Sequence, residues 1–218
     1  MTKDILIKKR DGTSEKLNLD KIHFVVEEAC ADLTGVSASQ IEMNADLQFT
    51  DGMTTQQIQE VLIRSANDLI SLENPNYQYA AARLLLYGLQ KQVYGSYEHL
   101  TLTTIIDKNI ERGVYDPAIK EKYTASELKK MNTWMKHDRN EDFTYAGLRQ
   151  VVDKYLCQDR SSGDIYETPQ IMYMMIAATL FAEYPEETRL TYVKKYYDAT
   201  SLFKINIPTP VMAGVRTP

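Results

Sequence analysis

Apolar residues recur at spacings of three and four along most of this chain, which is the periodicity of an amphipathic helix. One such stripe, between residues 20 and 33, is formed by Ile22, Val25, Val26, Ala29 and Leu33. Only nine glycines and seven prolines interrupt the 218 residues, and these are the residues least compatible with a helix interior. The sequence therefore predicts a mainly α fold.

Start and stop signals bound the expected helices. Thr54 with Gln57 and Thr124 with Glu127 have the spacing of capping boxes, and Ser39 is the predicted N-cap of a further helix with Glu42 three residues on. Gly95 and Gly113 are predicted helix stops. The expected helices cover residues 20–33, 39–47, 54–69, 75–94, 100–112, 124–137, 145–157, 169–184 and 186–203.

Three short segments have strand character. Residues 5–7 and 14–17 flank the turn signal Asp11-Gly12, which predicts an N-terminal hairpin. The polar loop at 159–164 is expected to join two short strands, and residues 204–207 are expected to form another, followed by a segment without helical period. These elements predict a hairpin-capped four-helix domain over residues 1–95 and a second helical domain over 96–218.

Composition excludes several classes of protein. The formal net charge of −5 argues against bulk electrostatic binding to nucleic acid or an anionic membrane. The longest apolar run, residues 171–182, is too short for a membrane span and indicates a buried helix. Cys30 and Cys157 lie far apart, and the N-terminus has no signal-peptide pattern, so a reduced cytoplasmic protein with buried thiols is expected. His23, His99 and His137 are too scattered to predict a metal site.

The segment Lys8-Lys9-Arg10-Asp11-Gly12 is the strongest local charge signal. Its cations could face a polyphosphate through charge-assisted hydrogen bonds, or they could be a solvated strand end that protects a sheet edge. Asn18 and Asp20 stand where the hairpin leads into a helix, and helix N-termini favour anions. Lys21 and Lys91 are further candidate phosphate ligands.

These residues and several later motifs resemble a known family. Residues 7–12, 15–22, 51–58 and 75–84, ending with Lys91 and Tyr94-Gly95, resemble an ATP-cone. His137-Asp138-Arg139, residues 143–145, residues 166–170 and residues 207–218 resemble the large (alpha) subunit of class I ribonucleotide reductase. The resemblance covers the whole chain, and the cone together with the 208–218 segment makes it specific.

The resemblance implies that the cone binds ATP, which activates the enzyme, or dATP, which inhibits it, with accompanying Mg²⁺. Gln59 departs from the family pattern, in which a histidine stands there, so the resemblance does not extend to the strength of dATP inhibition. The allosteric nucleotide-binding residues that the resemblance implies are Lys9, Glu15, Lys16, Leu17, Asn18, Leu19, Asp20, Lys21, Thr55 and Lys91. The chemistry of the side chains adds Arg10 at the phosphates and Ile22, Ile58 and Tyr87 at the adenine, and Gln59 completes the predicted site.

For catalysis the resemblance implies reduction of ribonucleotides to deoxyribonucleotides by active-site cysteines in a ten-stranded α/β barrel. Neither Cys30 nor Cys157 falls on those cysteine positions, and the barrel is expected beyond Pro218, so this chain alone is expected to be inactive and to carry no redox cofactor. Thr209 matches a position that contacts substrate. The implied partners are the rest of the alpha subunit, the radical-generating beta subunit and further alpha copies. A free-standing nucleotide-sensing module without enzymatic role is the alternative.

Overall fold

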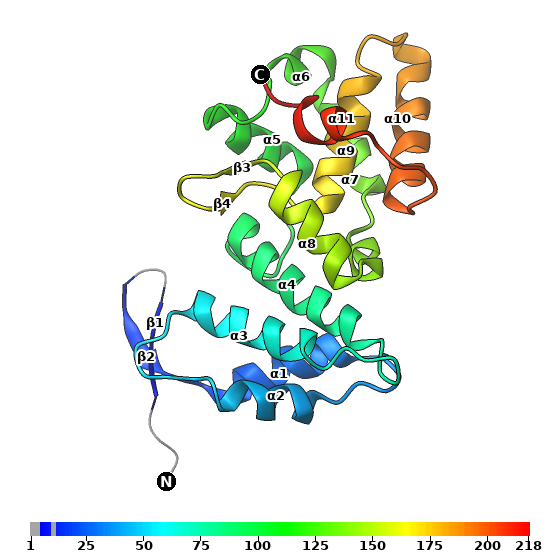
Figure 1. The fold of residues 1–218 in the computed structure, drawn as a ribbon. Helices are drawn as coiled ribbons and strands as arrows, with labels where there is room; N and C mark the ends of the chain where they lie inside the picture. Colours follow the sequence, from blue (N-terminus) through cyan, green and yellow to red (C-terminus); the bar gives the residue numbers. More distant parts are fainter. Residues whose placement is uncertain (1–4, 10–11) are drawn as a thin grey trace. The chain divides into compact units, whose positions relative to one another are not determined.

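The computed structural model describes residues 5–9 and 12–218, and its main chain is predominantly helical (Figure 1). It divides into two compact units. The first is Met1–Gly88 with Glu141–Arg149, and the second is Leu89–Asn140 with Gln150–Pro218. The first unit thus includes a segment that follows much of the second in the sequence. The domain boundary predicted between residues 95 and 96 stays a prediction.

The first unit begins with the predicted hairpin. Strand β1, Leu6–Lys8, pairs antiparallel with β2, Ser14–Lys16, in the register Leu6↔Lys16 and Lys8↔Ser14. Gly12 has a φ of +84°, the left-handed conformation that glycine tolerates and a tight turn requires. Asp11, the other predicted turn residue, lies outside the described residues.

Four helices complete the first unit, and their starts follow the polar residues before them. Thr54 and Gln57 form the predicted capping box, but the N-cap of the second helix is Ser37, not Ser39. Both serines precede the same apolar stripe, and the extended backbone at Ser37 lets its hydroxyl accept a hydrogen bond from the Gln40 amide. The helices are α1 Leu19–Cys30, α2 Ala38–Asp46, α3 Thr55–Asn67 and α4 Tyr77–Tyr94, of which α4 continues into the second unit.

The core of the first unit is formed by the inward faces of these helices and one hairpin residue. Ile7 is buried, whereas its neighbours Leu6 and Lys8 are exposed, as the alternation of a strand requires. Small residues at 80–82 let other helices approach α4 closely. The most buried apolar side chains of this unit, including one from its 141–149 segment, are Val26, Ala29, Ile41, Ala45, Leu62, Ile63, Ala66, Tyr77, Ala80, Ala81, Ala82, Leu84, Leu86 and Leu148.

The second unit is helical apart from one hairpin, whose two strands are two residues long. The polar loop at 159–164 joins these strands, as predicted. The Thr124 and Glu127 capping box is also confirmed. The five-residue helix α6 was not predicted, because it is too short to show a helical period. The elements of the second unit are α5 Leu102–Glu111, α6 Ala118–Lys122, α7 Ala125–Trp134, the 3₁₀ helix His137–Asp142, α8 Tyr145–Lys154, β3 Gln158–Asp159, β4 Asp164–Ile165, α9 Pro169–Leu180, α10 Glu186–Ser201 and α11 Thr209–Gly214. The 3₁₀ helix and α8 are shared between the two units.

Helix α9 forms the centre of the second unit. Every residue from Pro169 to Ala178 is buried, so the prediction that the apolar run is a buried helix is confirmed. Helix α10 packs beside it (Figure 1). Within the described residues no helix has both the length and the apolar character that a membrane span requires.

The C-terminal segment differs from the expectation. Residues 204–207, all of them described, form no strand, and a short helix, α11, follows where no helix was expected. Pro208 precedes α11 in extended conformation, and Pro210 stands in its first turn, where the missing N–H is not needed. A six-residue helix that contains a proline and follows another shows no apolar period, which explains why α11 was not predicted.

Candidate functional site

Strand β1 connects the starts of two helices in the first unit. On one edge it pairs with β2, which leads directly into α1. On the other edge the Lys8 amide donates to the Met53 carbonyl at 2.9 Å. Lys8 also forms an isolated parallel β-bridge with Thr54, the N-cap of α3. The N-termini of helices carry partial positive charge and unpaired N–H groups, so this corner of the unit favours an anion.

Lys9 follows β1 directly and is half-buried. Its ammonium lies 2.6 Å from the Glu15 carboxylate on β2, so the hairpin brings these two predicted site residues together. The Lys9 backbone is also fixed, because its amide donates to the Thr13 carbonyl at 2.8 Å. Arg10, which follows Lys9 in the predicted phosphate site, lies outside the described residues.

The predicted stretch from Lys16 to Lys21 crosses from β2 into the first turn of α1. The Asn18 side chain caps this helix by accepting the Lys21 amide at 3.0 Å. Lys16, Asn18, Leu19, Asp20 and Lys21 are exposed, and Leu17 and Ile22 are half-buried. The polar groups at this helix start are therefore accessible to a ligand in the first unit.

The start of α3 carries three further predicted residues. Thr55 is the first residue of the helix and is half-buried, while Ile58 faces the core with 6% exposure. The Gln59 side chain donates to the Leu84 carbonyl at 2.6 Å and covers Gly88, where an added Cβ would lie 3.2 Å from Gln59 Cγ. Gln59 is thus held against α4 by a hydrogen bond and by contact with a glycine that leaves room for it.

Two predicted residues lie on α4. Tyr87 is half-buried, and burial raises the pKa of its hydroxyl. Lys91 is exposed and belongs to the second unit, where its ammonium lies 5.7 Å from the centre of the Tyr97 ring. Among the described predicted residues, Lys9 contacts Glu15, and Asn18 contacts the amides of Lys21 and Ile22. The remainder of the predicted nucleotide site stays a prediction.

Sequence reasoning missed two residues that fix this part of the molecule. The Asp51 carboxylate accepts a hydrogen bond from the Leu6 amide at 2.8 Å and so anchors the start of β1. Arg83 donates to the Ala31 carbonyl at 2.6 Å and pairs with Glu141 at 3.5 Å. Asp51 could have been found from its place before Gly52 in a turn. Arg83 gives no local signal, because its partners lie far away in the sequence.

Thr209, the predicted substrate contact, begins α11 in the second unit. Its hydroxyl lies 3.3 Å from the hydroxyl of Tyr155, a residue that directly follows α8. Both residues are at least partly exposed. The structure therefore presents two neighbouring hydroxyl groups on one side of α11.

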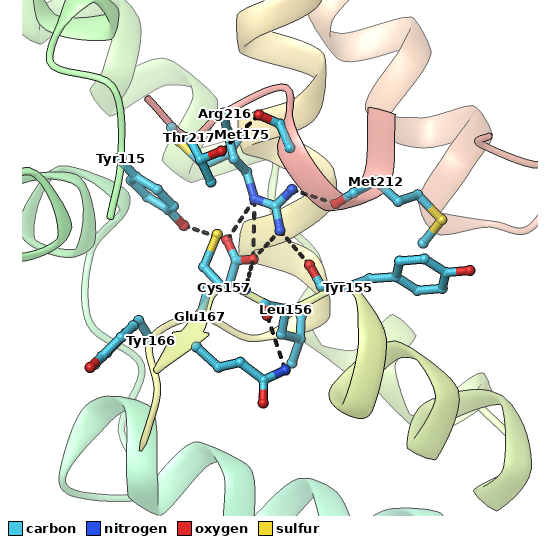
Figure 2. A network of polar contacts seen from close by, with 12 residues as sticks. Tyr115, Tyr155, Leu156, Cys157, Tyr166, Glu167, Met175, Met212, Arg216 and Thr217 are labelled. Atoms are coloured by element: carbon cyan, nitrogen blue, oxygen red, sulfur yellow. Dashed lines mark hydrogen bonds and ion pairs between the residues drawn. The ribbon is translucent and has the colours of Figure 1, made fainter. Parts of the chain in front are cut away.

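The second unit also contains a buried polar cluster (Figure 2). The guanidinium of Arg216 contacts both carboxylate oxygens of Glu167, and neither side chain has exposed surface. The Tyr115 hydroxyl donates to the same carboxylate at 2.5 Å, and the Cys157 amide donates to it at 2.8 Å. Burial raises the pKa values of Tyr115 and Cys157, and the Glu167 charge adds to both effects.

The cysteines and histidines show no other site. Both cysteines lie in the described part of the chain, where neither forms a disulfide, and burial raises the pKa of Cys30 to about 11. His99 and His137 stack with their ring centres 3.9 Å apart. Among the residues that the structure describes, no three His, Cys, Asp or Glu side chains are grouped as metal ligands would be.

Comparison with known proteins gives two family matches and many relatives. The model of the ATP cone domain matches residues 5–92, and that of the ribonucleotide reductase all-alpha domain matches residues 141–218. Ribonucleoside-diphosphate reductase 1 subunit alpha of Escherichia coli (strain K12) is 49% identical over 218 residues, which are 100% of this chain and 29% of that protein. The ribonucleoside-diphosphate reductase alpha subunit of Haemophilus influenzae is 47% identical over 100% of this chain and 29% of that protein. The alpha subunit of Enterobacteria phage T4 is 41% identical over 96% of this chain and 28% of that protein.

The fold and these matches define the class: an ATP-cone domain is followed by a ribonucleotide reductase all-alpha domain. The chain is homologous to the N-terminal region of ribonucleoside-diphosphate reductase alpha subunits, and it spans less than a third of their length. The resemblance inferred from the motifs is confirmed, and so is the mainly α fold without a barrel.

Proposed function

We propose that this chain is the regulatory N-terminal part of a ribonucleoside-diphosphate reductase alpha subunit, in which the cone binds ATP as activator or dATP as inhibitor, with Mg²⁺. The match of residues 5–92 to the ATP cone domain carries the proposal. The corner formed by the hairpin and the starts of α1 and α3 supports it, because two helix N-termini and a lysine suit a polyphosphate.

Within the first unit the roles divide by chemistry. Lys9 and Lys21 supply charge for phosphates, and Glu15 and Asn18 supply hydrogen-bond acceptors for base or ribose. Ile22 and Ile58 are the apolar candidates for the adenine ring, and Thr55 is placed for the sugar. ATP and dATP differ only in the 2′-hydroxyl, so discrimination must come from the shape of the pocket and the polar contacts near that hydroxyl.

Catalysis requires further parts. The proposed partners are the remaining C-terminal part of the alpha subunit, which supplies the barrel and its cysteines, the radical-generating beta subunit, and other alpha copies. Nucleic acid and membrane are not among them. The chain by itself is proposed to convert no ribonucleotide, because binding cannot replace positioned radical chemistry. If the gene is split, adding the complementary C-terminal fragment and the beta subunit is expected to give turnover.

Calorimetric titration with ATP and with dATP tests the cone. Lys9→Ala is expected to weaken binding by about tenfold or more, since a charge-assisted bond contributes about 1.5–3 kcal/mol. Lys129→Ala, an exposed lysine on α7, is the matched control and should bind like the parent. Circular dichroism of each variant establishes that the helices are retained. The proposal fails if the parent binds neither nucleotide at millimolar concentration, and the site assignment fails if Lys9→Ala binds as tightly as the parent.

A further inference from the structure

The C-terminal segment of the second unit is fixed by a single buried side chain. Among residues 202–218, all of which the structure describes, Arg216 alone is buried, with 1% exposure. Its neighbours, including all of α11, are exposed or half-buried. Apolar burial therefore contributes little to the position of α11, and the contacts of Arg216 must supply most of it.

Arg216 joins its own C-terminal segment to three segments that are distant in sequence, and Figure 2 shows its side-chain contacts. Its guanidinium binds the Glu167 carboxylate before α9, with the Nε–Oε2 distance at 3.0 Å. It also donates to the Met212 carbonyl in α11 at 2.6 Å and to the Tyr155 carbonyl after α8 at 2.8 Å. The Arg216 carbonyl accepts the Asp116 amide at 3.1 Å.

Two of these contacts lead to the hydroxyl pair on the surface. Tyr155 is held by Arg216 through its carbonyl and approaches Thr209 through its hydroxyl. Met212 lies in the same short helix as Thr209. The guanidinium thus fixes the backbone on both sides of the pair from inside the unit.

We infer that Arg216, locked by Glu167 and Tyr115, is a positioning residue that sets α11 and holds the Thr209 and Tyr155 hydroxyls in place for the substrate. The inference rests on the proposed function and on the expectation, implied by the family resemblance, that Thr209 contacts the ribonucleotide. Tyr155 enters as a second substrate-positioning residue, because its hydroxyl lies beside that of Thr209.

Arginine suits this role through the shape of its charged group. A guanidinium has five N–H donors in a planar fork, so it can bind a carboxylate and two carbonyls at once, whereas a lysine ammonium is a point charge on a flexible stem. Arg216→Lys keeps the positive charge that Glu167 needs and loses the fork. It therefore loosens α11 without leaving a buried charge unpaired.

Hydrogen exchange on this chain tests the positioning directly. In Arg216→Lys we expect the amides of residues 209–217 and the Asp116 amide to exchange at least about tenfold faster than in the parent. The matched control is Arg189→Lys, which alters another nearly buried arginine of the same unit that binds a carboxylate, Glu127, at 2.7 Å. In this control the same amides should stay within about twofold of the parent. Equal exchange of residues 209–217 in Arg216→Lys and the parent would overturn the inference.

Steady-state kinetics of the full-length alpha subunit with its beta subunit test the link to the substrate. Arg216→Lys and Tyr155→Phe are expected to raise the KM for a ribonucleoside diphosphate about fivefold or more with kcat within about twofold, and Arg189→Lys should leave both unchanged. Faster exchange with an unchanged KM would overturn the role toward substrate. A parent enzyme without reductase activity would refute the proposed function, while the exchange experiment would still decide whether Arg216 positions α11.

Discussion

The two units use charged side chains in opposite ways. In the first unit the ion pair of Lys9 and Glu15 lies near the surface, with side-chain exposures of 40% and 34%. In the second unit Glu167 and Arg216 pair with no exposed side-chain surface. An exposed charge contributes little to stability and is accessible to a ligand. A buried pair fixes distant segments of chain, and removing one partner is costly. Burial therefore separates residues suited to binding from residues suited to architecture.

The largest effect is expected from breaking the buried pair. Arg216→Ala leaves the Glu167 carboxylate uncompensated in the core and should lower the free energy of unfolding by about 3–5 kcal/mol. Urea unfolding followed by circular dichroism measures this. Lys194→Ala, which removes an exposed ion pair with Asp198 in the same unit, should change it by less than about 1 kcal/mol. Similar losses of unfolding free energy for the two variants would contradict the contrast between the buried and the exposed ion pair.

A second prediction concerns pH and His137. Burial lowers the pKa of His137 to about 4, with the stacked His99 adding to the effect and Asp138 opposing it. Between pH 6.5 and 4 the unfolded chain takes up a proton that the folded chain does not, so stability falls as the pH drops through this range. The loss is on the order of 3 kcal/mol. His137→Phe should remove that part of the pH dependence in urea unfolding series, and an unchanged slope between pH 6.5 and 5 would refute the assignment.

The surface pair of the first unit should behave differently. Lys9→Ala is expected to lower the free energy of unfolding by no more than about 1 kcal/mol, because the pair with Glu15 is partly solvated. The same variant is expected to lose nucleotide affinity. Thermal unfolding without nucleotide measures the first quantity. A loss as large as that of Arg216→Ala would mean that Lys9 is mainly structural.

The smallest effect is expected at His23 in the first unit. A hydrogen bond from its ring to Glu42 raises the pKa of His23, and Glu27 adds to this. The associated stability is present below pH 6.5 and is lost as the pH rises through the folded-state pKa. An NMR titration of the histidine ring protons should place the midpoint of His23 above 6.5 and that of His137 near 4. In Glu42→Gln the His23 midpoint should fall toward 6.5, and no fall would exclude the hydrogen bond as the cause.

What the sequence predicted is the part of the fold set by near neighbours. Thr54 with Gln57 and Thr124 with Glu127 cap their helices because both partners lie within four residues. The N-terminal hairpin and the buried helix α9 follow in the same way from short patterns. Within the candidate site the contact of Asn18 with the Lys21 amide is also of this local kind.

What the sequence could not predict depends on distant partners. Arg216 stands in an exposed segment and is buried only because Glu167, 49 positions earlier, meets it. The same reason hid the role of Arg83, whose acceptor at Ala31 is 52 positions away. Residues 204–207 were wrongly predicted as a strand, since apolar alternation over four residues does not show whether a pairing strand exists. The nucleotide site stays a prediction.

The first unit is built from two separate stretches of the chain, and this affects its folding during synthesis on the ribosome. Glu141–Arg149 belong to this unit although Leu89–Asn140 precede them in the chain. The ion pair of Arg83 with Glu141 therefore cannot form until all of Leu89–Asn140 has been translated. At about 5–20 residues per second this delay lasts several seconds, during which the first unit lacks its last segment. A fragment that ends at residue 95 lacks that segment, so a fragment meant to contain the whole first unit should extend beyond Arg149.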